Sequence, residues 1–484
     1  MRARRLLSSA AAAFALAGLT APTATAAPLP AGQDPFYVYS GAQPLAQIAP
    51  GTVLKSRSVV LGLGTTRTPV NAVQLLYRTT DQAGDPSATV TTVLTPPTSS
   101  VLPRMVGYLS FYDGLSPRCD PSYTLAGGDA GGMDEQEAEE EELQILHYVA
   151  QGFIVTIPDF EGTGLHWMAG RESGYGALDA VRATTSYLHL AATTPVGLTG
   201  YSGGAVAANW AAELAPAYAP QVDLVGIAMG GIPVDYWHMF AYIDGTDEYS
   251  SAIPGMLLGL ARAYHLDLSS YLSAYGLQVV KAEQEMCIAS TFGHYPGLTI
   301  AKIMRPPYQD LRTVAVFVRM LNEQIMGSAA GHPRVPILVG NGNSDGKGDG
   351  VMRADDVAAL AHAYCAEGVP VELQTYPHAN HITAGAFFDP QTGPFFQERF
   401  AGLPFVDGCA TIGAGDSIAP VPMPATEPAV HRAPARATRP VTATRPATVT
   451  RASGPLAATG LPDDVPFAAS FAALAGLLVR RRRA

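Results

Sequence analysis

One serine of the chain lies in a sequence pattern that can present its hydroxyl group for nucleophilic attack. Residues 200–204 read Gly-Tyr-Ser-Gly-Gly, the pattern G-x-S-x-G with Ser202 at its centre. The small neighbours allow a sharp, strained turn between a strand and a helix, and they aim the N–H of Gly203 at a developing oxyanion. The apolar run 196–199 precedes this turn, and the helix-forming run 205–210 follows it. We therefore predict that Ser202 is a nucleophile.

A second match to the same pattern lacks this context. Residues 342–346 read Gly-Asn-Ser-Asp-Gly, with Ser344 at the centre. The residues after Ser344 are Asp, Gly, Lys and Gly, and they do not begin a helix. Of the two serines, only Ser202 has the strand before it and the helix after it that an exposed nucleophile requires.

A serine hydroxyl becomes an effective nucleophile only when a histidine takes its proton and an acidic residue orients that histidine. In chains with this turn the order is serine, acid, histidine, and the last two follow late strands. The loop after the next-to-last predicted strand contains Asp345 and Asp349. The loop after the last predicted strand contains His378 and His381. The pattern alone leaves both choices open.

The acidic loop has a second interpretation as a calcium-binding loop. Asp345, Asp349 and Gly350 match acidic and glycine positions of such a loop, and Asp356 matches its last acidic position. Lys347 stands where an oxygen ligand is needed. We therefore predict no metal site and no cofactor.

Strand and helix signals alternate through the middle of the chain. Short apolar runs bounded by turn residues predict buried strands, and longer amphipathic runs predict helices between them. Such alternation is typical of a mostly parallel sheet covered by helices. We predict strands at residues 104–112, 152–157, 196–199, 224–229, 335–339 and 371–376, and helices at 133–151 and 205–214.

The stretch 235–321 interrupts this rhythm between two predicted strands. Its pattern is mostly helical, and it is rich in apolar residues such as Met256, Leu257 and Leu260. We predict that it forms a helical cap over the C-terminal ends of the strands.

Several local motifs together resemble the secretory lipase family of the lipase A type. They read Tyr-Asp at 112–113, Cys-Asp-Pro-Ser-Tyr at 119–123, Pro-Asp-Phe-Glu-Gly at 158–162, Gly-Tyr-Ser-Gly-Gly at 200–204 and His-Ile-Thr-Ala at 381–384. The resemblance covers roughly residues 100–390. It implies an α/β-hydrolase fold, for which we place the catalytic domain at 27–416. It also implies a secreted enzyme that hydrolyses acyl esters such as acylglycerols without a cofactor.

The resemblance also implies which residues form the catalytic triad. In the family, the acid is the first residue of an Asp-x-x-Val-Pro segment. Asp349 stands at this position, and His381, later in the chain, stands at the position of the base. Met352 and Arg353 stand where the family has Val and Pro, so Asp345 stays an alternative acid.

The same resemblance implies an oxyanion hole made by the backbone N–H groups of Asp113 and Gly203. It also bears on the four cysteines, which in an exported protein suggest two disulfides and by number allow three pairings. The disulfides implied by the family are Cys119–Cys287 and Cys365–Cys409.

Both ends of the chain have the composition of targeting segments. Residues 1–26 combine an Arg-rich start, an apolar stretch and small residues, which predicts a secretory signal peptide. Residues 417–455 are rich in Pro, Ala, Thr and Arg, which predicts a disordered spacer. Residues 456–484 contain Leu-Ala-Ala-Thr-Gly, an apolar stretch and an Arg tail. They resemble a cell-wall sorting signal, in which a sortase would join Thr459 to peptidoglycan.

The composition limits the partners of the chain. Its formal net charge is −11, which argues against a nucleic-acid partner because such a partner requires clustered Lys and Arg. The partners that we predict are a lipid or other acyl ester, and a sortase and peptidoglycan at the C-terminus. We predict a monomer anchored outside the cell. Acyl transfer, peptide hydrolysis and an inactive surface binding protein remain alternatives to ester hydrolysis.

Overall fold

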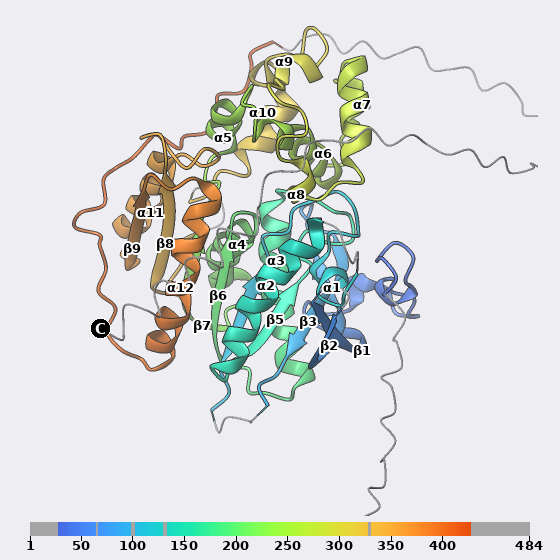
Figure 1. The fold of residues 1–484 in the computed structure, drawn as a ribbon, viewed down its shortest axis with the longest axis vertical. Coiled ribbons are helices and arrows are strands. Elements are labelled where there is room, and N and C mark those ends of the chain that lie inside the picture. Colours follow the sequence, from blue (N-terminus) through green and yellow to red (C-terminus); the bar gives the residue numbers. More distant parts are fainter. Residues whose placement is uncertain (1–27, 64–65, 98–101, 129–132, 328–330, 427–484) are drawn as a thin grey trace, which may run out of the picture.

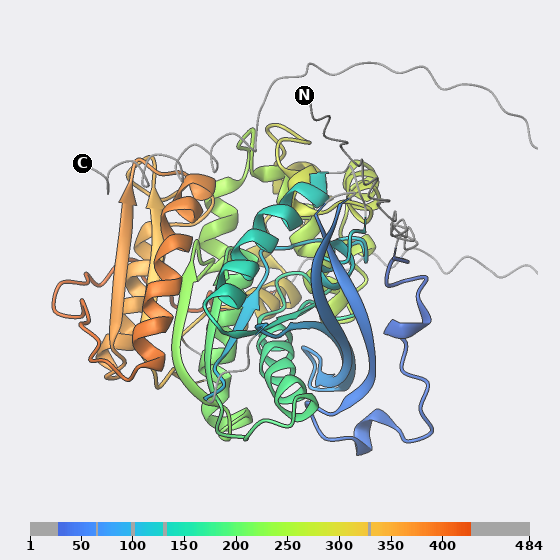
Figure 2. The ribbon, with the colours of Figure 1, turned by 60° about the horizontal axis from the view of Figure 1, so that its bottom comes forward.

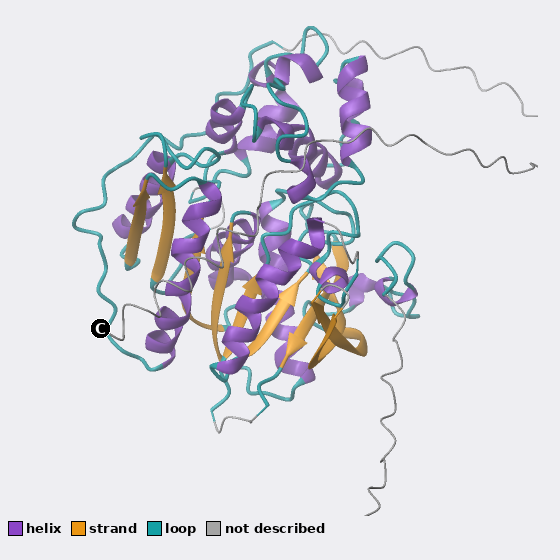
Figure 3. Cartoon of the chain, viewed as in Figure 1, coloured by secondary structure: helices purple, strands orange, loops and turns teal. Residues whose placement is uncertain are grey.

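The structure, a computed structural model, describes residues 28–426 except 64–65, 98–101, 129–132 and 328–330 (Figure 1). The predicted signal peptide, the sorting signal with Thr459 and the predicted spacer from residue 427 onward lie outside the described residues. The described part forms a central sheet between helices, with a further group of helices at one end (Figure 3). Within this part, no helix has the length and apolar character needed to cross a membrane.

The sheet of the described residues has nine strands in the order β1-β2-β3-β5-β4-β6-β7-β8-β9. The pairs β1–β2, β2–β3 and β3–β5 are antiparallel, and every pair from β5 across to β9 is parallel. The six predicted strands correspond to β4 through β9. The strands are β1 (Val53–Leu63), β2 (Thr66–Thr80), β3 (Pro86–Leu94), β4 (Met105–Leu109), β5 (Ile154–Pro158), β6 (Pro195–Tyr201), β7 (Asp223–Gly230), β8 (Ile337–Asn343) and β9 (Val371–Pro377).

Alternate residues of the parallel strands pack on opposite faces of the sheet. In β7, Ile227 and Met229 belong to the apolar core on one face, and Ala228 belongs to the core on the other. Helices α3 and α4 contribute to the first core, and α2 and α12 contribute to the second (Figure 2). Because helices cover both faces of the sheet, these strands have apolar residues at consecutive positions instead of an alternation of apolar and polar residues. The helices beside the sheet are α2 (Met133–Ala150), α3 (Gly170–Tyr187), α4 (Gly203–Tyr218), α11 (Ala354–Ala366) and α12 (His381–Phe400).

The segment between β7 and β8 is helical and lies beyond the carboxyl ends of the parallel strands (Figure 1). It occupies the stretch in which the sequence predicts a cap, and we call it the cap. Its helices are α5 (Tyr236–Ile243), α6 (Ile253–Ala263), α7 (Ala274–Glu283), α8 (Ile288–Thr291), α9 (Ile300–Ile303) and α10 (Ala315–Asn322), with 3-10 turns η3 (Ser250–Ala252), η4 (Leu268–Ser270) and η5 (Leu311–Thr313).

The ends of the described chain run along the outside of this body. The N-terminal part contains the 3-10 turns η1 (Pro35–Tyr37) and η2 (Leu45–Gln47), and a short helix α1 (Pro121–Thr124) follows β4. The segment after α12 reaches the cap, where Val421 and Asn322 exchange two hydrogen bonds of 2.8 and 2.9 Å. The first residues of the predicted spacer are therefore packed against α10.

Two disulfides join distant parts of the described chain. Cys119–Cys287 connects the loop after β4 to the cap, and Cys365–Cys409 connects the end of α11 to the C-terminal segment. This is the pairing that the family resemblance implies.

Candidate active site

Ser202 lies at the turn between β6 and α4, where the backbone is strained. Its φ of 53° and ψ of −117° cost on the order of 1–3 kcal/mol for a residue with a side chain. A side chain at Gly200 would collide with the backbone of Gly204, and a side chain at Gly204 would collide with the carbonyl oxygen of Leu109. The glycines are therefore required for the turn that presents the Ser202 hydroxyl.

Three predicted residues come together into one hydrogen-bonded chain. The Nε2 atom of His381 lies 2.9 Å from Oγ of Ser202, and its Nδ1 atom lies 2.8 Å from Oδ2 of Asp349. His381 begins α12 after β9, and Asp349 lies in the loop between β8 and α11. Because the ionised carboxylate can only accept, Nδ1 carries the proton and Nε2 offers its lone pair to the serine hydroxyl. This arrangement can transfer the serine proton to the imidazole.

The surrounding backbone fixes Asp349 in place. Its Oδ1 atom accepts hydrogen bonds from the N–H groups of Val351 (2.9 Å) and Met352 (2.6 Å). Its backbone carbonyl accepts from the N–H of His381 (2.8 Å). Both side chains that follow Ser202 in this hydrogen-bonded chain are almost completely buried, with exposed fractions of 0% for Asp349 and 3% for His381. Side-chain and main-chain hydrogen bonds together therefore fix the distance between the Asp349 carboxylate and the His381 imidazole.

The structure places the alternative residues away from this chain. Asp345 is exposed, and its Oδ1 atom accepts from the backbone N–H groups of Lys347 (2.8 Å) and Gly348 (3.0 Å). This carboxylate, the first ligand in the calcium interpretation, therefore caps a turn. His378 is exposed, and the Ser344 hydroxyl donates to the carbonyl of Gly348 (3.2 Å).

The two predicted oxyanion donors border the nucleophile. Gly203 is the first residue of α4, and Asp113 lies in the loop after β4. Both line one pocket together with Ser202 and His381. The carbonyl of Asp113 accepts a hydrogen bond from Ile288 in the cap (2.9 Å). The cap therefore contributes to the position of the Asp113 loop.

The pocket above Ser202 is mainly apolar and narrow, with a cavity volume of about 30 Å³. This volume lies below the usual range of small-molecule sites, so a bound acyl chain requires the side chains of the wall to move. Methionine side chains are prominent in its wall and can adapt to an alkyl chain. Sequence patterns identified these residues only as apolar, because periodicity does not show which of them face the site. The wall includes Trp167, Met168, Met239, Met256, Phe292 and Met352.

The sequence model of one protein family matches residues 133–408, which is more than half of the chain. The description of that family is secretory lipase. The chain belongs to the secretory lipase family. The family predicted from the motifs is therefore confirmed.

Curated relatives match most of the length of this chain. A Mycobacterium tuberculosis protein named a probable inactive lipase is 32% identical over 78% of this chain and 84% of its own length. Lipase A of Arthroderma benhamiae is 29% identical over 81% of this chain and 84% of its own length. A secreted triacylglycerol lipase of Malassezia furfur is 30% identical over 78% of this chain and 77% of its own length.

A solved structure supports the assignment of the fold. Candida antarctica lipase A in its closed state superposes with a TM-score of 0.71 and 27% identity, over 82% of this chain and 93% of that one. The predicted α/β-hydrolase fold, a mostly parallel sheet flanked by helices, is confirmed for this chain.

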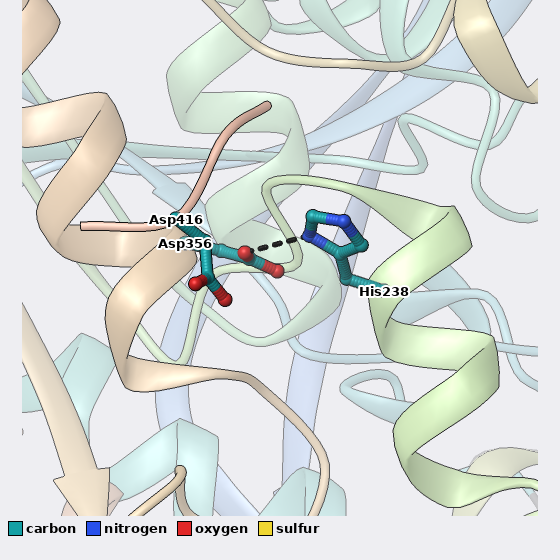
Figure 4. A group of neighbouring side chains, drawn as sticks. All are labelled: His238, Asp356 and Asp416. Atoms are coloured by element: carbon teal, nitrogen blue, oxygen red, sulfur yellow. Dashed lines mark hydrogen bonds and ion pairs between the residues drawn. The ribbon is translucent and has the colours of Figure 1, made fainter. Parts of the chain in front are cut away.

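Outside the pocket, the fold brings His238, Asp356 and Asp416 together from α5, α11 and the C-terminal segment (Figure 4). Each side chain already has a partner. His238 Nδ1 lies 2.8 Å from Asp356, and Arg353 donates to Oδ2 of Asp416 at 2.6 and 3.1 Å. Burial raises the pKa of Asp356 to about 6. These contacts tie the cap to α11, and we assign no metal to them.

Proposed function

We propose that this member of the secretory lipase family hydrolyses acyl esters through an acyl-enzyme formed on Ser202. The observation that carries the proposal is the chain of hydrogen bonds from Ser202 through His381 to Asp349 at the base of an apolar pocket. The family assignment supports the same class of reaction. The apolar wall favours a substrate with an alkyl chain, and acylglycerols fit that description.

The proposed reaction has two stages. Ser202 Oγ attacks the acyl carbonyl carbon while His381 Nε2 takes the hydroxyl proton, and Asp349 stabilises the resulting imidazolium. His381 then gives that proton to the leaving alcohol. In the second stage His381 takes a proton from water, the hydroxide attacks the acyl carbon, and Ser202 recovers its proton. The N–H groups of Gly203 and Asp113 stabilise the oxyanion in both stages.

Hydrolysis of p-nitrophenyl esters from acetate to palmitate tests this proposal. We expect cleavage of medium or long esters, and a loss of at least about 10³-fold in kcat for Ser202→Ala. His378→Ala is the matched control and keeps its activity, because its ring is exposed away from the triad. Absence of cleavage at every chain length would contradict ester hydrolysis.

A binding protein without activity is the second candidate, because one relative is named a probable inactive lipase. The hydrogen-bonded Ser202, His381 and Asp349 argue against it. Unaltered ester with measurable binding would favour this candidate. Acyl transfer is distinguished by adding glycerol as an acceptor, since a transferase forms a new ester where a hydrolase releases the acid.

We infer that the protein is exported and attached to the cell wall through Thr459. The support is the signal-like segment 1–26 and the order of motif, apolar stretch and Arg tail in 456–484. Mass spectrometry of digested cell walls tests this inference. We expect a peptidoglycan-linked peptide that ends at Thr459, and Thr459→Ala releases the protein from the wall. The same wall-bound fraction in both proteins would contradict the inference.

A further inference from the structure

Tyr201, the residue before the nucleophile, connects Ser202 to the histidine by a second route. It is the last residue of β6, and its hydroxyl donates a hydrogen bond of 2.6 Å to the backbone carbonyl of His381. The Ser202 hydroxyl contacts the side chain of the same histidine through Nε2. Two consecutive residues of the chain therefore hold both the imidazole and the main chain of His381.

The ring of Tyr201 also packs against the imidazole of His381. The centroids of the two rings lie 5.2 Å apart, and the ring planes are tilted by 42°. The ring of Phe388, a buried residue of α12, packs against the same phenol at a centroid distance of 6.1 Å. Packing of this kind restricts the rotation of a side chain, so the Tyr201 ring limits the orientations open to the imidazole.

Glycines leave the space that the Tyr201 ring occupies. A Cβ atom at Gly230 would lie 2.7 Å from Cδ2 of Tyr201. A Cβ atom at Gly231 would lie 2.8 Å from Cζ of Tyr201 and equally close to Cε1 of His381. Gly385 on α12 approaches the ring as well, since a Cβ atom there would lie at 3.3 Å. The end of β7 and the helix α12 thus enclose the phenol closely.

The hydroxyl of Tyr201 keeps its proton over the pH range in which ester hydrolysis is measured. Removal of the phenol from water raises the pKa of Tyr201 well above its ordinary value, and the charge of Asp349 raises it further. A neutral phenol donates to a carbonyl oxygen, whereas a phenolate only accepts. The hydrogen bond to His381 is therefore retained in that range.

The contacts of Asp349 and of Tyr201 with His381 have different consequences. Asp349 holds the N–H and Nδ1 of His381, and so fixes the histidine relative to the acidic loop. Tyr201 fixes it relative to the strand that carries the nucleophile. The contact between Nε2 and Ser202 cannot do this throughout the reaction, because an acylated serine has no hydroxyl proton to donate.

We propose that Tyr201 is a positioning residue that holds His381 at the distance from which it takes and returns the proton of Ser202. This inference rests on the proposed ester hydrolysis. The hydroxyl fixes the main chain of His381, and the ring fixes the imidazole. Tyr201 takes no proton and forms no covalent bond in the reaction. It is not among the described residues that line the pocket, so its loss affects kcat and not substrate binding.

Tyr201→Phe tests the proposal, because it removes the hydroxyl and keeps the ring. We expect kcat for p-nitrophenyl octanoate to fall by about tenfold with KM changed by less than about twofold, since a small displacement of the base slows proton transfer. Tyr201→Leu removes the ring as well and should lower kcat by about 100-fold. A wild-type kcat in Tyr201→Phe would overturn the proposal.

Tyr148→Phe is the matched control for the loss of a hydroxyl group that binds α12. Tyr148 on α2 is 1% exposed, and its hydroxyl is hydrogen-bonded to Thr392 on the same helix as His381. We expect both Tyr-to-Phe variants to unfold at a lower urea concentration than the wild type. Only Tyr201→Phe should lose kcat. Similar losses of kcat in the two variants would overturn the proposal, because they would show a general effect of α12 on the site.

A double-mutant cycle shows whether Tyr201 acts through His381. In the His381→Ala background, Tyr201→Phe should cause no further loss of kcat, because no imidazole remains to be positioned. The same loss in both backgrounds would overturn the proposal, since Tyr201 would then act independently of the histidine.

Labelling of Ser202 by a p-nitrophenyl alkylphosphonate separates this proposal from ester hydrolysis. The serine oxygen bonds to phosphorus, His381 takes the hydroxyl proton, and p-nitrophenolate leaves without a deacylation step. We expect labelling to be about tenfold slower in Tyr201→Phe than in the wild type, and unchanged in Tyr148→Phe. Equal rates in the wild type and Tyr201→Phe would overturn the positioning role. If labelling follows the expected order but no ester is cleaved, the positioning role stands while the proposed function fails.

Discussion

The backbone carbonyl of Asp113 accepts a hydrogen bond from the N–H of Ile288 at 2.9 Å. This bond joins the loop that carries a proposed oxyanion donor to the cap. Gly114, which follows Asp113, and Cys287, which precedes Ile288, form a β-bridge. The disulfide Cys119–Cys287 links the same two segments. The cap and the loop after β4 are therefore held together by this backbone pairing and by the disulfide.

Removal of this disulfide tests whether the connection positions the oxyanion loop. We expect the double variant Cys119→Ala/Cys287→Ala to lower the free energy of unfolding by about 2–5 kcal/mol. We also expect kcat to fall more than KM rises, because a displaced N–H stabilises the transition state less. Denaturant unfolding and ester kinetics measure the two effects.

The second disulfide supplies the control for that experiment. Cys365→Ala/Cys409→Ala is expected to reduce stability without a comparable loss of kcat, because this bond joins α11 to the C-terminal segment. Equal losses of kcat in the two double variants would show that the first disulfide has no special effect on the site.

Asp349→Asn tests the assignment of the acid. The amide can donate a hydrogen to Nδ1 of His381, which would move the imidazole proton to Nε2 and block the acceptance of the serine proton. We expect kcat to fall by about 10³- to 10⁴-fold. Asp345→Asn is the control and should change kcat by less than about threefold, because Asp345 caps an exposed turn. A larger effect at Asp345 than at Asp349 would reverse the assignment.

The raised pKa of Glu283 predicts how the stability of the fold depends on pH. This residue is buried in the cap, neither of its carboxyl oxygens has a hydrogen-bond partner in the described part of the chain, and burial raises its pKa from 4.5 to about 9. The folded state thus binds a proton that the unfolded state releases. Its contribution to stability is complete below about pH 4.5 and is lost as the pH rises toward about 9.

Glu283→Gln should therefore be more stable than the wild type at pH 8, on the order of 4–5 kcal/mol, and close to it at pH 4.5. Thermal or urea unfolding at the two pH values measures this difference. Glu285→Gln, an exposed change two residues away, should leave stability unaltered at both. A gain in Glu283→Gln of the same size at both pH values would contradict the titration of Glu283.

Ala252→Leu tests whether the apolar pocket holds the acyl chain. Ala252 lines the pocket and is 3% exposed, so a larger side chain removes space next to the substrate. We expect the ratio of kcat/KM for octanoate to that for acetate to fall by about tenfold. Ala274→Leu adds the same atoms at an exposed position and should leave the ratio unchanged. An unchanged ratio in Ala252→Leu would place the acyl chain elsewhere.

Local sequence determined the parts of the site that depend on neighbours in the chain. The glycines around Ser202 predicted the turn on which this serine lies, because a strained strand-to-helix turn needs small residues within two positions of the serine. The apolar runs that became β4 through β9 were also recognisable, since strands covered on both faces contain few polar residues. By contrast, local sequence did not indicate β1, β2 and β3. These strands pair antiparallel, and no local pattern relates the residues that become partners.

Only the tertiary structure decided which side chains meet. Asp345 and Asp349 share one loop, and their distances from His381 depend on how β8, β9 and their loops pack. Asp113 and Glu161 follow different strands, and both lie at the same edge of the sheet because β4 and β5 pair in parallel. The pocket wall comes from a cap that is inserted between β7 and β8 and folds back over Ser202. Sequence periodicity records which residues are apolar, but burial beside a particular group is a property of long-range packing.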